Sequence, residues 1–196
     1  MNSTGTASPW LAIASLAAVT TSVSGCIPLA ITAVGAGAMV AADPRSTATQ
    51  LDDELIETKI AEVIKERLKG EYHAVSTSYD GVVLLTGQVP SASDKAQIVE
   101  IARTTPKVRS IEDELVVGPV AGARIRTNDA LITSKVKARF VEASLFQANH
   151  VKVVTEQNVV YLMGVVRQEE ADHAVRIART TSGVQRVVKV FEYFNG

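Results

Sequence analysis

From residue 52 onward, the chain alternates between helical and strand-like patterns of apolar and polar positions. The first helical pattern has apolar side chains at spacings of three and four residues, namely Ile56, Ile60, Val63 and Ile64. This spacing predicts an amphipathic helix with one buried stripe. The pair Asp52-Asp53 suits the N-cap and first turn, and Gly70 suits the C-terminal cap. We therefore expect the first helix to begin at this acidic pair and to end near Lys69-Gly70.

Two short β-rich runs follow, Val75–Tyr79 and Val82–Gly87. Asp80-Gly81 joins them, which indicates a two-residue hairpin turn because both of its central positions favour positive φ. Helical spacing returns over Ser91–Thr105, and Val108–Val117 alternates enough to predict a third strand. The predicted order of elements in this half is α-β-β-α-β.

The second half predicts the same order. Thr127 or Asn128 is expected to cap a helix whose apolar positions again have a spacing of four: Ile132, Val136 and Phe140. The later elements expected are hairpin strands Val151–Thr155 and Val159–Gly164 across Gln157-Asn158, a helix over Glu169–Thr181, and a strand from Gly183 to Phe194. Two helices covering one face of a three-stranded sheet in each half predict an α+β fold.

The chain also contains an internal repeat. Ile101–Thr105 returns residue for residue as Ile177–Thr181, and Asp53 matches Asp129 at the same offset. Two copies are too few for a solenoid, so the repeat indicates two small modules in tandem. A module of about 65 residues has a marginal core, so we expect the two modules to pack on each other.

The N-terminus has the pattern of a lipoprotein signal peptide over residues 1–25. The apolar run Trp10–Val19 is too short to span a bilayer, and it leads into Val23-Ser24-Gly25-Cys26, which resembles a bacterial lipobox. Cys26 would then carry a diacylglycerol and an N-acyl chain, with no other cofactor expected, and residues 26–51 would form the tether. Met1–Pro9 lacks Lys and Arg, so an uncleaved membrane helix and an incidental Cys stay open as alternatives.

The second strand of each module ends in a Leu-x-Gly step, Leu85-Thr86-Gly87 and Leu162-Met163-Gly164, and Gly183-Val184 leads from the last helix to the last strand. Tandem α-β-β-α-β modules with these steps resemble BON domains over nearly the whole chain. The resemblance implies BON modules at 52–118 and 128–196, joined by a linker at 119–127, each with a three-stranded mixed sheet covered by two helices. The first module departs from the pattern, since Lys107-Val108 stands where Gly-Val is expected.

The resemblance also implies a function. Such proteins are non-enzymatic, lipid-anchored lipoproteins on the periplasmic face of the outer membrane. They bind anionic phospholipid, phosphatidylglycerol or cardiolipin, through the second module, and they support envelope integrity at division sites. Ile27, rather than Asp, follows the lipobox Cys, which by resemblance to sorted lipoproteins favours the outer membrane.

Charge is distributed unequally between the modules. Residues 52–118 contain 8 basic and 13 acidic side chains, a net charge of −5, whereas residues 124–196 contain 11 basic and 7 acidic ones, a net charge of +4. A basic second module indicates an anionic partner surface. Leu131, Lys135 and Arg139 recur at a spacing of four on its first helix, and an apolar tip above two cations is typical of an interfacial helix.

These three residues are therefore the candidates for lipid binding. The alternative that Lys135 and Arg139 are an ordinary solvated helix face stays open. The corresponding first-module positions, Leu55 and Lys59, lie among glutamates and are not expected to bind lipid. The first module offers no sign of a ligand and is expected to act as a scaffold.

Other function classes fit the sequence less well. His73, His150 and His173 have no metal-ligand spacing, and the lone thiol is the predicted acylation site, so neither a metal site nor catalytic residues are expected. Nucleic-acid binding is disfavoured because the basic residues are not interleaved with aromatic ones. The helix macrodipole explains the acidic pairs Asp52-Asp53 and Glu169-Glu170.

The alternative function is a protein-interaction module whose basic face docks an envelope assembly factor, such as the outer-membrane β-barrel assembly machinery. Leu145 and Phe146, which follow the first helix of the second module, are expected to make core or inter-module contacts rather than to face a membrane.

Overall fold

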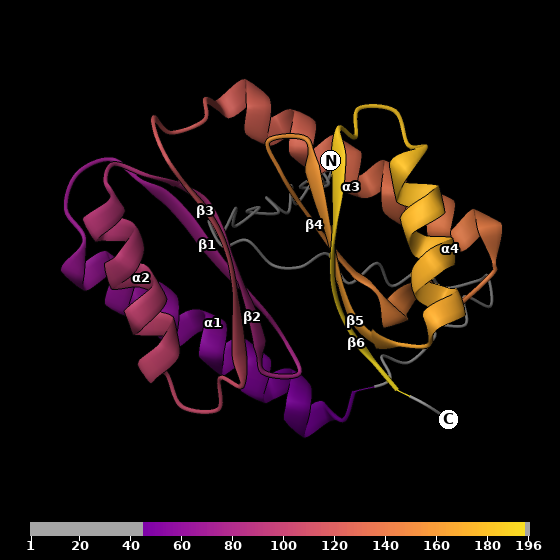
Figure 1. Ribbon diagram of the computed structural model, residues 1–196, viewed down its shortest axis with the longest axis horizontal. Helices are drawn as coiled ribbons and strands as arrows, with labels where there is room; N and C mark the ends of the chain where they lie inside the picture. Colours follow the sequence, from indigo (N-terminus) through magenta and orange to yellow (C-terminus); the bar gives the residue numbers. More distant parts are fainter. Residues whose placement is uncertain (1–44, 195–196) are drawn as a thin grey trace, which may run out of the picture. The chain divides into compact units, whose positions relative to one another are not determined.

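The computed structural model describes residues 45–194, which form two α-β-β-α-β modules (Figure 1). The first contains α1 (Thr47–Arg67), β1 (His73–Tyr79), β2 (Val82–Val89), α2 (Ala92–Thr104) and β3 (Ser110–Val117). The second contains α3 (Ala123–Ala143), a short 3-10 turn η1 (Ala148–His150), β4 (Lys152–Glu156), β5 (Val159–Val166), α4 (Gln168–Arg179) and β6 (Arg186–Tyr193). The predicted α+β order is confirmed in both halves. The predicted lipobox and Cys26 lie outside the described residues.

Each module builds its own three-stranded mixed sheet. The orders are β1-β2-β3 and β4-β5-β6, with an antiparallel hairpin followed by a parallel crossover strand. Asp80 and Gly81 have φ of 51° and 77°, and Gln157 and Asn158 have φ of 47° and 62°. Positive φ at both central positions is the geometry predicted for these two-residue turns.

The helices cover one face of each sheet (Figure 1). The apolar stripe of α1 is buried with side chains of β2 and α2, and the stripe of α3 is buried with side chains of β4, β5 and α4. Ile60, Val136 and Phe140 are fully buried. In the described residues, no helix is long and apolar enough to cross a membrane.

A third apolar cluster joins the two sheets. It combines Tyr79, Val82 and Leu84 of the first sheet with Tyr161, Met163 and Val190 of the second. Because neighbouring residues of a strand point to opposite faces, β2 sends Val83 and Leu85 toward its helices and Leu84 toward the other sheet. Every residue of β2 is consequently buried.

Both first helices begin earlier than their sequence patterns indicate. α1 begins at Thr47, with Ser46 as N-cap accepting a 3.1 Å hydrogen bond from the Thr49 N–H, so the expected start at Asp52-Asp53 is wrong. α3 begins at Ala123 after Gly122, so the expected cap at Thr127 or Asn128 is also wrong. The apolar stripe marks only the part of a helix that touches the core, and the first turns of both helices extend beyond it.

The helix-to-strand step differs between the modules, as its sequence indicates. Gly183 has φ of 99°, and a Cβ there would lie 3.0 Å from Cγ1 of Ile132. Lys107 holds the corresponding place with φ of 70°, and its Nζ pairs with Asp52 at 2.5 Å. A lysine therefore adopts the left-handed conformation that the glycine supplies in the second module.

Candidate functional site

The outward face of α3 carries exposed apolar side chains. While Ile132, Val136 and Phe140 face the core, Leu131 and Val141 on the opposite side are 56% and 66% exposed. Ser134 and Ala138 lie between them at steps of three and four residues, which places the set on one helix face. Leu145, just past the helix end, is 56% exposed. Small or apolar side chains therefore line the solvent side of this helix.

Cations flank this apolar face. Lys135 and Lys137 are exposed on α3, and Arg124 is exposed in its first turn. Glu142 is the acidic side chain exposed near the other end of the helix. We call Leu131, Lys135, Lys137 and Val141 the α3 surface.

Arg139, the third predicted lipid-binding residue, is turned toward α4. Its Nη1 donates hydrogen bonds to the Ile177 carbonyl at 2.9 Å and to the hydroxyls of Thr180 and Thr181 at 3.0 and 2.9 Å. A cation at the C-terminal end of a helix is stabilised by the helix dipole. These acceptors are a carbonyl and two hydroxyls, so none of them is a carboxylate that would offset the positive charge of Arg139. The structure thus exposes Leu131 and Lys135 together and fastens Arg139 between the two helices.

Leu145 and Phe146, which follow the end of α3, have different surroundings. Phe146 packs edge-on against Phe140, with ring centroids 5.0 Å apart, as the core contact that was expected. Leu145 is mostly exposed, so its expected core or inter-module contact is wrong. Ser144 adopts a left-handed conformation with φ of 51° at the helix end, and the chain that follows packs Phe146 inward while Leu145 stays outside.

The corresponding helix of the first module has a different surface. Leu51 and Leu55 of α1 are 56% and 57% exposed, much like Leu131. Lys59 holds the position of Lys135, but Ala61 stands in place of Lys137, and Glu54, Glu62 and Glu66 are exposed on the same helix. Exposed leucines are thus common to both helices, and charge distinguishes them.

Asp53 and its repeat equivalent Asp129 have a role that the sequence reading missed. Both are buried inside helices, at 3% and 4% exposure, rather than placed at helix starts, so the macrodipole explanation is wrong for Asp53. Glu169 and Glu170 do lie in the first turn of α4, as predicted.

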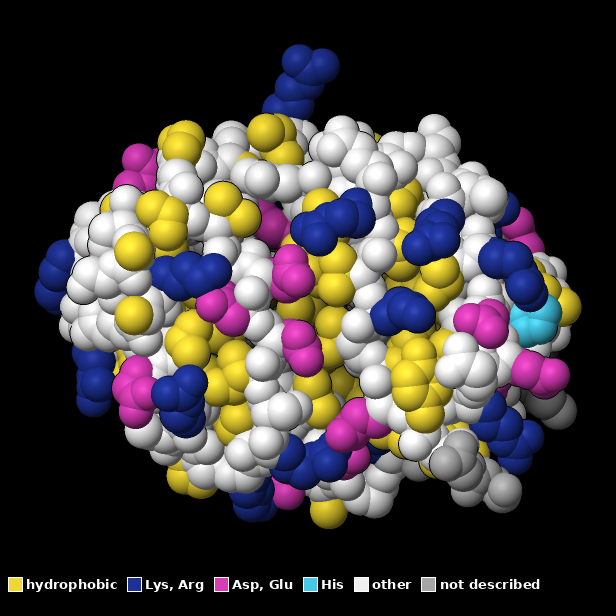
Figure 2. Space-filling view, viewed as in Figure 1, with side chains coloured by type: hydrophobic (Ala, Val, Ile, Leu, Met, Phe, Trp, Pro, Cys, Tyr) yellow, Lys and Arg dark blue, Asp and Glu magenta, His cyan; other side chains and the backbone are white. Residues whose placement is uncertain are grey.

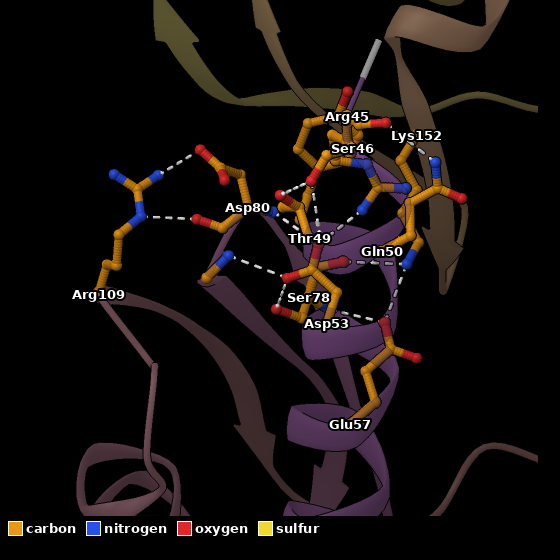
Figure 3. Close-up of polar contacts among 12 residues, drawn as sticks. Arg45, Ser46, Thr49, Gln50, Asp53, Glu57, Ser78, Asp80, Arg109 and Lys152 are labelled. Carbon is orange, nitrogen blue, oxygen red and sulfur yellow. Dashed lines mark hydrogen bonds and ion pairs between the residues drawn. The ribbon is translucent and has the colours of Figure 1, made fainter. Parts of the chain in front are cut away.

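Asp53 holds the first hairpin turn (Figure 3). Its carboxylate accepts hydrogen bonds from the N–H groups of Asp80 and Gly81 at 2.8 and 2.9 Å, from Ser78 Oγ at 2.6 Å and from Arg45 Nη1 at 2.6 Å. Burial alone would raise the pKa of Asp53, but these hydrogen bonds together hold it below its ordinary value.

Asp129 holds the second hairpin in the same way. It accepts the N–H groups of Gln157 and Asn158 at 2.9 and 2.8 Å. The signal available in the sequence was the exact repeat of this aspartate, 76 residues apart, ahead of each hairpin.

Polar contacts cross between the modules at several places. Lys152 of β4 donates to Glu57 Oε1 at 2.9 Å and to the Ser78 carbonyl at 3.1 Å (Figure 3). Gln88, which is 1% exposed, donates to Glu156 and accepts from the N–H of Ala121. Tyr161 donates to Glu114 at 3.3 Å, and burial raises the pKa of its hydroxyl.

The three histidines lie in separate settings. His73 faces Glu156 at 3.4 Å, His150 faces Glu170 at 3.4 Å, and His173 contacts Arg176 at 2.7 Å. Over residues 45–194, no three His, Cys, Asp or Glu side chains gather closely enough to hold a metal ion.

Comparison with known proteins gives several relatives. The chain is 35% identical to the outer membrane lipoprotein DolP of Haemophilus influenzae, over 97% of this chain and 100% of that protein. It is 35% identical to a 21 kDa hemolysin of Actinobacillus pleuropneumoniae, over 77% of this chain and 79% of the relative. It is 31% identical to the osmotically-inducible protein Y of Escherichia coli, over 78% of each chain.

Among solved structures, a type III secretion protein of Chlamydia trachomatis, CdsD, aligns with 14% identity and a TM-score of 0.30, covering 73% of this chain and 93% of that one. A TM-score this low supports no conclusion. The BON domain family matches residues 52–119 and 128–193, which are the two modules described above. The chain therefore belongs to the BON domain family, with two BON domains in tandem.

Proposed function

We propose that this protein is an outer-membrane lipoprotein that faces the periplasm and binds anionic phospholipid through the α3 surface. The observation that carries the proposal is the pairing of exposed apolar side chains, Leu131 and Val141, with exposed Lys135 and Lys137 on one helix. Outer-membrane placement is supported by the similarity to the lipoprotein DolP over the whole length of that relative. Binding rather than catalysis is the activity we propose.

Electrostatic attraction and burial of apolar surface both favour binding of α3 to an anionic membrane. Each lysine near such a surface contributes about 1 kcal/mol, and insertion of the two half-exposed apolar side chains adds about 25 cal/mol for each Å² removed from water. Arg139 adds to the attraction, because its hydrogen bonds to α4 hold it in place with neutral acceptors that do not offset its positive charge. Phosphatidylglycerol and cardiolipin are the lipids that we expect to bind.

Lipidation has a separate role in this proposal. A diacylglycerol and an N-acyl chain on Cys26 hold the protein at the membrane whether or not α3 binds. The α3 surface then selects anionic regions of that membrane and sets how the second module lies on it. Such selection is a route to envelope support at sites where anionic lipid gathers, division sites among them.

Vesicle flotation tests the proposal. Residues 40–196, a compact unit that contains both cores and lacks Cys26, are mixed with zwitterionic vesicles and with vesicles containing phosphatidylglycerol. The unit is expected to float with the anionic vesicles alone, and Lys135→Glu/Lys137→Glu is expected to weaken binding at least about tenfold, since two attractive charges of about 1 kcal/mol each become repulsive.

The matched control is Lys59→Glu/Lys65→Glu, which makes the same charge change with exposed lysines of α1. This control is expected to float like the unchanged unit. Equal loss of binding in both variants would mean that net charge, rather than the α3 surface, governs attachment. Absence of flotation with either lipid would contradict the proposal.

A further inference from the structure

The outer edge of β6 differs from the outer edge of β3, although the two strands occupy the same place in their modules. Each is the last strand of its sheet and pairs on one side, β3 with β2 and β6 with β5. In a parallel pair, alternate residues direct their N–H and C=O groups away from the neighbour. In β3, Leu115 is one of the residues whose backbone groups point outward, and it lies opposite Gly87 of β2. Phe191 of β6 has the same place in the second module, because it lies opposite Gly164 of β5.

The edge of β3 is closed by its own module. The N–H of Leu115 donates to Asp113 Oδ1 at 3.1 Å, and the Leu115 carbonyl accepts from Lys95 Nζ at 2.6 Å. Lys95 and Asp113 also pair with each other at 3.2 Å. Both outward groups of this residue are therefore occupied, so a further strand would have to displace an ion pair.

The second module has no equivalent of the Lys95–Asp113 pair. Ala171 stands in place of Lys95 and is fully buried, and Lys189 stands in place of Asp113. Within residues 45–194, no hydrogen bond reaches the outward backbone groups of Lys189 and Phe191. The edge of β6 is thus open along the part of the chain that the structure describes.

The surroundings of the two edges also differ in charge. Beside β3, a shallow groove runs between the strand and α2, and its charged lining is mixed: Lys95, Glu100, Arg103 and Asp113. At the positions of these four residues, α4 and β6 carry Ala171, Arg176, Arg179 and Lys189, and the exposed Asp172 stands in place of the lining residue Ala96, so three cations face one carboxylate. The three cations are exposed. A segment that lies along β6 would therefore meet positive charge.

Apolar side chains lie at the same edge. Val187 and Phe191 are half-buried, and Tyr193 and Phe194 are 44% and 42% exposed. Figure 2 shows apolar side chains at the surface over β6, with Lys and Arg side chains among them. An added strand would find backbone partners, apolar contacts and positive charge together.

We propose that the outer edge of β6 binds an extended segment of a partner protein in which apolar and acidic residues alternate. The segment adds a fourth strand to the β4-β5-β6 sheet through backbone hydrogen bonds, which is a common mode of peptide recognition. Its carboxylates lie opposite Lys189 and near Arg176 and Arg179. A second copy of the chain fits less well, because antiparallel self-pairing centred on Lys189 sets two lysines opposite each other.

The probe for this proposal is a labelled synthetic peptide, EVEVEVEV, in which acidic and apolar residues alternate as the proposal requires. Its neutral counterpart is QVQVQVQV. Fluorescence anisotropy with residues 40–196 is expected to show saturable binding of the acidic peptide and at least tenfold weaker binding of the neutral one. Hydrogen exchange is expected to slow at the amides of Lys189 and Phe191 when the acidic peptide is bound.

Three variants make the test specific. Lys189→Pro removes an outward N–H, and Lys189→Glu reverses the central charge; both are expected to weaken binding of the acidic peptide at least tenfold. Lys65→Glu makes the same charge change on α1, outside both proposed sites, and is expected to bind the peptide normally. Circular dichroism melting establishes that each variant is folded, and the proposal stands on Lys189→Glu if Lys189→Pro does not fold.

Several results would overturn the proposal. Equal binding of both peptides, binding insensitive to Lys189→Glu, or no binding would remove the acidic-strand site. A dimer of residues 40–196 that Lys189→Pro dissociates would assign the edge to a second copy instead. Loss of flotation with anionic vesicles in Lys189→Glu would assign it to the membrane.

Discussion

A single buried aspartate in each module links the first helix to the first hairpin. Asp53 and Asp129 each accept both N–H groups of a two-residue turn. These N–H groups point into the protein at a tight turn, where leaving one without a partner costs about 1–3 kcal/mol. The aspartates therefore fix the position of each hairpin relative to its helix, and with it the register of the sheet.

Stability is expected to depend on pH through Asp53. Its pKa in the folded protein lies below the ordinary value of 3.8, so its contribution to stability is present above pH 3.8 and is lost as the pH falls through the lower, folded pKa. Urea unfolding of wild type and Asp53→Asn should therefore differ most near neutral pH. The difference should shrink steadily at pH values below about 3.8.

The control for this titration is Glu142→Gln, an exposed carboxylate on α3. Its stability should follow that of the wild type at every pH. A gap between wild type and Asp53→Asn that stays constant from pH 7 down to pH 2 would contradict the assigned role of the carboxylate charge.

At the scale of the element, α3 performs two tasks with its two faces. Its inner stripe completes the core of the second module, and its outer face presents the α3 surface. Arg139 connects these tasks, because it fastens the helix to the end of α4 at the side of the exposed lysine Lys135. A helix that is held rigidly loses less conformational entropy when it binds a membrane.

Arg139→Ala is expected to destabilise the second module by about 1–3 kcal/mol, since it removes three hydrogen bonds from a charged donor to α4. Chemical unfolding measures this loss, and hydrogen exchange should quicken at the last turn of α4. Lys135→Ala serves as the control, because that side chain is exposed, and its stability should stay within about 0.5 kcal/mol of wild type. Equal stability of Arg139→Ala and Lys135→Ala would show that the hydrogen bonds of Arg139 do not stabilise the packing of α3 on α4.

Much of the structure of these helices and hairpins can be predicted from sequence patterns, and the predictions that are wrong concern features set by distant parts of the fold. The hairpins were predictable because a two-residue turn requires positive φ at both central positions, which Gly, Asn and Asp adopt readily, and Asp80, Gly81 and Asn158 supply these residue types. Helix starts were misplaced because the apolar stripe marks only the part of a helix that touches the core, and the first turns of α1 and α3 extend beyond it. The orientation of Arg139 could not be predicted, since its partners lie about 40 residues away in sequence.

At the scale of the whole molecule, the described modules join through their sheets. Tyr79 and Leu84 meet Tyr161 and Met163 in an apolar layer, and Lys152 pairs with Glu57 at its border. The continuous apolar run of β2 is typical of a strand covered on both faces, but a sequence pattern does not say what covers the second face. The sequence predicted packing between modules from their small size alone.

The two repeats have diverged at the surface while their cores match. The surface of α1 is acidic and that of α3 is basic. The edge of β3 is occupied by the charged side chains Lys95 and Asp113, whereas the edge of β6 is open. We infer that the second module carries the binding functions proposed above and that the first supports it.

The most direct test of this account locates the α3 surface relative to lipid. The lone tryptophan of the chain, Trp10, is outside residues 40–196, so single tryptophans can report from matched positions, Leu131→Trp on α3 and Leu55→Trp on α1. With vesicles of brominated phosphatidylglycerol, Leu131→Trp fluorescence should shift to the blue and be quenched, while Leu55→Trp should stay unchanged. Quenching of both probes, or of Leu55→Trp alone, would contradict membrane binding through α3.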